Sequence, residues 1–158
     1  MQVCICSNQY GERKQLERLF QRSADRLIAA GEICYLHTYG SEGALLAEPM
    51  DFDLYMLDYQ EEEGDVSGQK ATALVTDLIR QRNLKTARFY LACPKPADDS
   101  PQIQYVKKPV TQGFVDTILN NRLADLKIEE EKVKQAIWEE EHRPPKNLKE
   151  AFYRWLNS

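Results

Sequence analysis

Residues 52–58 read FDLYMLD, and this stretch decides the fold. It is an apolar run of strand length without a helical period, which predicts a strand buried on both faces of a sheet. The run ends on Asp58, and the acidic stretch QEEEGDVSG (60–68) follows, which predicts a loop. An aspartate in this place is a polar cap on the strand, a metal ligand or a phosphate acceptor. The rest of the sequence has to separate these three roles.

Further strands and amphipathic helices alternate on both sides of this stretch. The predicted strands are 2–7, 32–40, 52–58, 87–93 and 103–109, and the predicted helices are 12–30, 41–49 and 69–83. In the helix at 69–83, the residues expected to face the sheet are Ala73, Leu74, Leu78 and Ile79. This alternation indicates an α/β fold of three layers, with an open, mostly parallel sheet of five strands between helices.

One connection departs from this alternation. The stretch PKPADDSPQ (94–102) contains three prolines, which are incompatible with an ordinary helix. A parallel crossover normally takes a dozen or more residues and a helix. We therefore expect the fourth crossover helix to be missing or reduced to a turn. The alternative is a fifth strand that pairs antiparallel at the edge of the sheet.

The C-terminal part of the sequence predicts a helical extension. From Thr111 to Arg143 the chain has no proline and no glycine after Gly113, which predicts one long helix. A small domain cannot bury that length, so the distal half must project, fold back or pair with another chain. A last helix over 147–158 carries Phe152, Trp155 and Leu156 on one face. These three residues either dock on a partner or cover the vacancy left by the missing crossover helix. The expected domains are 1–122 and 123–158.

Length and composition narrow the class of protein. The chain has 158 residues and a net charge of −4, which suits one domain with an appendage and argues against a nucleic-acid binder. No apolar run is long enough to span a membrane, and the N-terminus lacks a secretory leader. Four cysteines without such a leader indicate reduced thiols and a cytoplasmic protein. We expect these cysteines to be buried and structural, and a redox pair of Cys6 with Cys93 is a minor alternative.

Chemically useful residues collect where the predicted strands end. Ligand sites in open α/β sheets lie at the carboxyl ends of the strands. Those ends carry Ser7 and Asn8, Asp58, Ala92, and Lys108. An aspartate that faces a lysine at this edge is a workable phosphoryl site, because the carboxylate is a nucleophile and the lysine neutralises phosphoryl oxygens.

With these residues in place, the chain resembles the receiver domains of two-component response regulators, the flavodoxin-like class that includes CheY. The resemblance covers about residues 1–122. The opening MQVCICSNQYGERKQLERLF is most similar to receivers of LytTR-type regulators. FDLYMLD resembles the phospho-acceptor strand, which implies Asp58 as acceptor. YVKKP (105–109) resembles the family's Lys-Pro strand end, which implies Lys108 as the phosphate-binding lysine and Tyr105 as the switch aromatic.

The departures from the family pattern are equally specific. Ser7 and Asn8 stand where the family has an acidic pair that binds Mg²⁺, so the acidic pocket is degenerate and Asp58 is left as the one metal-ligand candidate. Ala92 stands where the family has a switch Thr or Ser. Glu12 or one of Glu61, Glu62 and Glu63 could replace the lost carboxylates, although no spacing argues for it.

Taken together, these residues predict an atypical receiver that acts in signal transduction as a phosphorylation-independent interaction module, without enzymatic activity and without a cofactor. The alternative is a conventional Mg²⁺-dependent switch phosphorylated on Asp58. A flavodoxin-like small-molecule binder is a third reading, but SNQYGER (7–13) is a poor phosphate loop. The expected partner is a signalling protein, such as a histidine kinase or a transcription regulator. A homodimer through the C-terminal helices is possible, whereas membrane and direct nucleic-acid binding are not expected.

Overall fold

The computed structural model describes residues 1–58, 69–93 and 101–158. The chain divides into two compact units, Met1–Leu123 and Ala124–Ser158, and each is described by itself. The predicted acidic loop at 60–68 lies outside the described residues. In the described part of the chain, no helix is long and apolar enough to cross a membrane.

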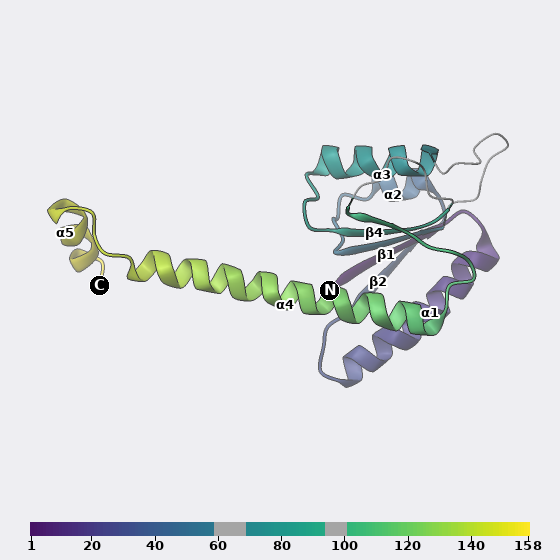
Figure 1. Cartoon of the computed structure of the whole chain (residues 1–158), viewed down its shortest axis with the longest axis horizontal. Helices are drawn as coiled ribbons and strands as arrows, with labels where there is room; N and C mark the ends of the chain where they lie inside the picture. The colour runs from purple at the N-terminus through teal and green to yellow at the C-terminus, as the bar shows by residue number, and fades with distance from the viewer. Residues whose placement is uncertain (59–68, 94–100) are drawn as a thin grey trace. The chain divides into compact units, whose positions relative to one another are not determined.

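The first unit alternates strands and helices along the chain (Figure 1). Its strands are β1 (Gln2–Ser7), β2 (Tyr35–Tyr39), β3 (Leu54–Asp58), β4 (Arg88–Ala92) and β5 (Ile103–Tyr105). Its helices are α1 (Tyr10–Ala29), α2 (Glu42–Ala47), α3 (Gln69–Arg82) and the first part of α4 (Gln112–His142). The second unit holds the rest of α4 and α5 (Leu148–Leu156).

The five strands form one parallel sheet in the order β2-β1-β3-β4-β5. β3 lies at the centre, and all five of its residues are buried, as its apolar sequence predicts. β2 lies at an edge, which its alternating pattern also indicates. The predicted α/β fold with a parallel sheet of five strands is therefore confirmed.

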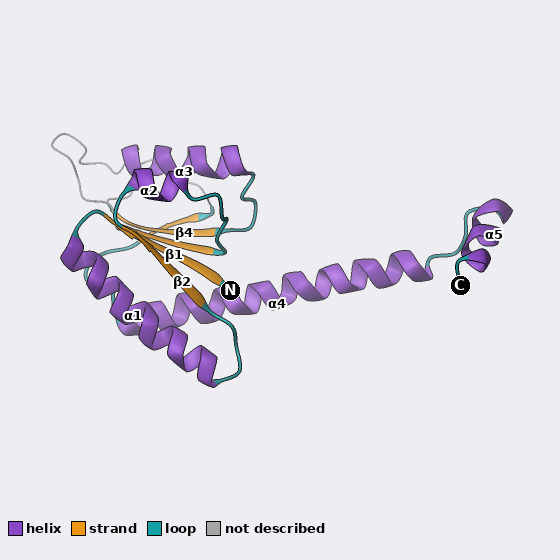
Figure 2. Cartoon of the chain, turned by 180° about the vertical axis from the view of Figure 1, so that it is seen from behind, coloured by secondary structure: helices purple, strands orange, loops and turns teal. Residues whose placement is uncertain are grey.

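Each face of the sheet has its own hydrophobic core, because successive strand residues point to opposite faces. α1 and the first part of α4 cover the face that carries Val3, Ile5 and Met56. α2 and α3 cover the face that carries Tyr55 and Leu57 (Figure 2). The result is the three-layer arrangement of helices, sheet and helices.

The connection between β4 and β5 is short. Only the ten residues 93–102 join the two strands, and the register places Phe89 opposite Ile103 in a parallel pair. The alternative of an antiparallel fifth strand is therefore wrong. Residues 94–100 lie outside the described part, so the loss of the crossover helix stays a prediction. β5 ends at Tyr105 rather than at 109, because β4, its neighbour among the described strands, ends at Ala92.

Two contacts tie β5 and the turn before it to the α3 side of the sheet. The hydroxyls of Thr72 on α3 and Tyr105 on β5 lie 2.6 Å apart. The side-chain amide of Gln102 donates to the carbonyl of Leu84, at 2.7 Å. Among the described helices, α2 and α3 are those that cover this face. The contact of Thr72 with Tyr105 shows that α3 also packs near the edge strand β5.

The helix ends follow the signals in the sequence. Gly31 has φ +87°, the left-handed conformation that ends α1. Ser41 caps α2 by accepting from the backbone N–H of Ala44 at 3.1 Å. Asn147 caps α5 by accepting from Glu150 N–H at 2.9 Å. In α3, Leu78 is buried as expected, but Ala73 is exposed, and Ala71 and Val75 are buried in its place.

Candidate functional site

The predicted site residues meet at the carboxyl edge of the sheet. The register pairs Ser7 with Asp58 between β1 and β3, and Asp58 with Ala92 between β3 and β4. Three consecutive strands of the sheet therefore end on Ser7, Asp58 and Ala92, side by side. Lys108 reaches the same edge from the segment after β5.

Both carboxylate oxygens of Asp58 face neighbouring polar groups. Lys108 Nζ lies 2.5 Å from Oδ1, and the Ser7 hydroxyl donates to Oδ2 at 3.2 Å. Oδ1 makes no hydrogen bond of regular geometry with the described residues, so its contact with Lys108 is an ion pair. The Asp58 side chain is 1% exposed and that of Lys108 is 37% exposed. The arrangement is a buried carboxylate neutralised by a half-buried ammonium group.

Ser7 is itself held in place. Its side chain is buried, and its hydroxyl also accepts from the backbone N–H of Gln9 at 3.3 Å. Arg13 donates to the Ser7 carbonyl at 3.1 Å. The first turn of α1 therefore fixes Ser7 against Asp58. The sequence placed Ser7 at this edge, but nothing in it predicted that its hydroxyl would bind the aspartate.

The described donor set does not suit Mg²⁺. A divalent hard cation needs several oxygen ligands, usually with more than one carboxylate. Asp58 is the only acid in the group formed with Ser7 and Lys108, and the described residues contain no cluster of three or more acidic, His or Cys side chains that could hold a metal. Glu12 borders a small cavity of about 60 Å³ that also touches Asp58 and Lys108. The other candidate acids, Glu61, Glu62 and Glu63, lie outside the described residues.

Of the two switch positions, Ala92 lies opposite Asp58 on the neighbouring strand, whereas Tyr105 lies opposite Leu91 on β5. Ala92 is buried and lines the same 60 Å³ cavity as Lys108, with a methyl group in place of a hydroxyl. Tyr105 is partly buried, and its hydroxyl pairs with Thr72. Nothing in the sequence pointed to Thr72, because a contact between a helix and a distant strand leaves no local pattern.

A second cavity, of about 330 Å³, borders Asp58 on the α2–α3 side of the sheet. Its walls are mainly apolar, and its polar lining comes from Cys6, Asn8, Ser41, Glu42 and Asp58. None of the described lining residues is basic. An anionic phosphate group would meet two carboxylates and no cation there, so this lining does not suit a flavin mononucleotide.

All four cysteines are free and buried, as expected. Burial, and to a smaller extent the nearby Glu42 carboxylate, raise the pKa of the Cys6 thiol to about 11. Burial also raises the pKa of Cys4 and Cys34. Since the thiolate is the reactive form, these three thiols have low reactivity.

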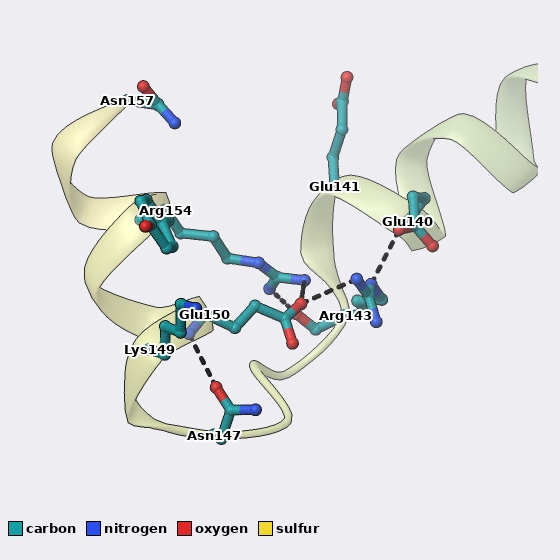
Figure 3. Close-up of a pocket in the computed structure, with 9 residues that line it drawn as sticks. Glu140, Glu141, Arg143, Asn147, Lys149, Glu150, Arg154 and Asn157 are labelled. Carbon is teal, nitrogen blue, oxygen red and sulfur yellow. Dashed lines mark hydrogen bonds and ion pairs between the residues drawn. The ribbon is translucent and has the colours of Figure 1, made fainter.

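The docking candidates in the C-terminal unit are exposed. Phe152, Trp155 and Leu156 on α5 are 56%, 70% and 54% exposed. Whether they dock on a partner or cover the edge of the sheet stays a prediction, because α5 belongs to the separate C-terminal unit. A hollow of about 700 Å³ lies beside α5 and is lined mainly by charged and polar residues of this unit (Figure 3).

Comparisons with known proteins give a structural likeness only. No family model and no curated protein matches the sequence. A solved protein described as pilus assembly-related, from Burkholderia pseudomallei, superposes with a TM-score of 0.54 at 14% identity, covering 78% of this chain and 90% of that one. The BeF₃-activated DrrB receiver domain gives 0.52 at 13% identity, covering 78% and 97%. Vibrio cholerae chemotaxis protein CheY4 gives 0.51 at 14% identity, covering 76% and 96%. The chain thus has the flavodoxin-like fold of CheY-like receiver domains, as its sequence predicted.

Proposed function

We propose that this protein acts in signal transduction as an atypical receiver, an interaction module whose binding to a signalling partner does not depend on phosphorylation of Asp58. One observation carries the proposal: both oxygens of the 1% exposed Asp58 carboxylate already face a partner, Lys108 and Ser7. The receiver fold and the opening's resemblance to LytTR-type receivers support a role in signalling. A histidine kinase or a transcription regulator is the class of partner that such a module would bind.

The chemistry of phosphoryl transfer explains why this pairing matters. An aspartate nucleophile needs an accessible oxygen and a divalent cation that bridges it to the phosphoryl group. Here Lys108 supplies the neutralising charge before any phosphate arrives. Ser7 and Asn8 add no negative charge that would hold a cation, and Ala92 adds no hydroxyl that would respond to a phosphoryl group.

The test is an exposure of the full chain to Mg²⁺ with beryllofluoride, followed by thermal denaturation, and to Mg²⁺ with a small phosphodonor, followed by intact mass. We expect no change in melting temperature and no added phosphoryl mass. Asp58→Asn and the exposed Asp51→Asn serve as matched controls and should behave like the unchanged chain. The double variant Ser7→Asp with Asn8→Asp restores the acidic pair and should gain a Mg²⁺-dependent shift.

A saturable, Mg²⁺-dependent shift in the unchanged chain that disappears in Asp58→Asn would contradict this proposal. That result would favour the alternative, a conventional Mg²⁺-dependent response regulator phosphorylated on Asp58. In that case Mg²⁺ would need further ligands from the chain.

A further inference from the structure

The apolar face of α4 continues beyond the sheet-covering part of the helix. Val115 and Leu119 are fully buried in the first unit. Leu126, Val133 and Ile137 follow Leu119 at spacings of seven, seven and four residues, which keep them on the same face. We call these three residues the distal stripe. Val133 and Ile137 are 59% and 53% exposed.

Helix α5 presents a second apolar face, which the described residues of the C-terminal unit leave exposed. Leu148, Phe152 and Trp155 are spaced four and three residues apart, and all three are more than half exposed. The opposite face of α5 is held by charge: Glu150 pairs with Arg143 at 2.8 Å and with Arg154 at 3.1 Å (Figure 3). Arg154 also donates to the Arg143 carbonyl. These polar contacts fix α5 beside the end of α4 and leave its apolar face uncovered.

The two helical segments carry opposite charge. Residues 124–142 contain seven acidic and three basic residues, a net charge of −4. Residues 143–158 contain four basic residues and one acidic residue, a net charge of +3. The apolar distal stripe lies in an acidic segment, and the aromatic face of α5 lies in a basic segment. The two faces are therefore complementary in charge. Basic α5 segments are attracted to acidic α4 segments, and the near-neutral sum lets two such units approach without repulsion.

The two apolar faces supply part of the area that an interface needs. Phe152 and Trp155 on α5 are 56% and 70% exposed. Because an aromatic side chain buries about 150–250 Å², these two hold roughly 250 Å² of coverable surface. A standard interface takes about 800 Å² from each partner, and the exposed aliphatic residues of the two faces, Val133, Ile137 and Leu148, add to the total.

We propose that the C-terminal unit is the interface of a homodimer, in which the basic, aromatic α5 of each copy covers the acidic distal stripe of the other. Each chain has one distal stripe and one α5. In a dimer with a two-fold axis, each α5 therefore covers the stripe of the other copy, and no stripe stays exposed. A membrane surface is a poorer occupant, because anionic headgroups would meet the acidic residues around the stripe. The dimer is independent of the phosphorylation proposal.

The experiment measures the mass of the full chain by sedimentation equilibrium over a range of concentrations. We expect twice the chain mass of 18.3 kDa. Ile137→Lys places a charge on the distal stripe and should raise the dimer dissociation constant at least about tenfold. Ile128→Lys is the matched control: Ile128 is 54% exposed against 53% for Ile137, but lies nine residues away on the opposite face of α4. Its dissociation constant should change less than about twofold.

Two further measurements, tryptophan emission and salt dependence, test the dimer if Ile137→Lys does not fold well. Both tryptophans, Trp138 and Trp155, lie in the C-terminal unit, so their emission should shift to the blue as the concentration rises and should not do so in Ile137→Lys. Lys149→Glu should weaken the dimer more at low salt than at high salt. A single-chain mass at all concentrations overturns the proposal, as does equal weakening by Ile128→Lys and Ile137→Lys. Stripe-dependent binding to anionic vesicles by a monomer would also overturn it, in favour of a membrane surface.

Discussion

One face of α4 is buried in the first unit and exposed in the second. The buried residues on this face stabilise the fold, and we propose that the exposed ones bind a second copy of the chain. In the first unit, Leu119 on this face is fully buried between the helix and the sheet. In the second unit, Ile137 on the same face is 53% exposed. The same contrast holds for charge, since Asp58 is buried and paired, whereas Glu139 and Glu141 are exposed. In the first unit the Asp58 carboxylate is buried, whereas in the second unit apolar side chains such as Ile137 are exposed.

The largest loss of stability should come from a substitution at Leu119, the buried residue on the same face of α4. Leu119→Ala removes a fully buried side chain and leaves a cavity in the α1–α4 core, so the free energy of unfolding should fall by about 3 kcal/mol. Ile137→Ala should change the unfolding of the first unit by less than about 0.5 kcal/mol. Urea denaturation followed by far-ultraviolet circular dichroism measures both, at a concentration where the chain is monomeric. Equal losses in the two variants would erase the contrast.

The next effect concerns the buried charge. Lys108→Ala leaves the Asp58 carboxylate buried without its ionic partner. Breaking a fully buried pair costs about 3–5 kcal/mol, and the 37% exposure of Lys108 should reduce the loss to about 2–3 kcal/mol, because water screens the pair. The adjacent, exposed Lys107→Ala should cost less than about 0.5 kcal/mol.

A double variant identifies the cause of that loss. Adding Asp58→Asn to Lys108→Ala removes the unpaired charge, so part of the lost stability should return in the same denaturation experiment. If Lys108→Ala and Lys107→Ala cost the same, the pair with Asp58 contributes nothing to stability, and the site is open rather than closed.

A smaller and pH-dependent effect should come from the contact between α1 and α4. The Ser23 hydroxyl donates to Asp116 at 2.5 Å, and Arg26 pairs with the same carboxylate at 2.6 Å. The hydrogen bond from Ser23 is the main cause that lowers the pKa of Asp116, with Arg26 contributing. A lowered pKa in the folded state stabilises the fold above the ordinary aspartate pKa of about 3.9, and this stabilisation is lost as the pH falls through the folded-state pKa.

Ser23→Ala should therefore cost about 1 kcal/mol at neutral pH, and the cost should shrink below about pH 4 as Asp116 becomes protonated. Urea denaturation at a series of pH values measures the difference between the two chains. Thr117→Ala is the control, because the hydrogen bond of its hydroxyl within the described residues goes to the Gly113 carbonyl of its own helix. A Ser23→Ala deficit that stays constant into acid would mean that the variant acts through packing.

The fold was predictable because its signals are local. The residues of β3 before Asp58, LYML (54–57), form an apolar run, and this strand lies at the centre of the sheet. Ser41, Asn147 and Gly31 mark helix ends by their own conformation or side-chain chemistry. The phase of α3 was not predictable in detail, because alanine is compatible with both faces of a helix and Ala73 turned out to be exposed.

The candidate site was predictable in its membership and in one of its contacts. Parallel strands bring their carboxyl ends to one edge, so Ser7, Asp58 and Ala92 had to be neighbours. The sequence also predicted that Asp58 faces Lys108 at this edge, and the ion pair between them agrees with that expectation. The pairing of Tyr105 with Thr72 was not predicted, because it depends on where α3 lies over the sheet. Packing between separate elements of this kind leaves no periodic trace in the sequence.

The short connection between β4 and β5 has a consequence for how the sheet assembles. Phe89 and Ile103 are 14 residues apart in the chain, whereas Leu54 and Arg88, which pair β3 with β4, are 34 apart. Closing the shorter loop costs about 0.8 kcal/mol less chain entropy. Non-local contacts slow folding, and this edge of the sheet has the most local pairing of the five strands. The β4–β5 pair should therefore form before the central strands β1 and β3 pair. Pairing at this edge of the sheet is then an early step of folding.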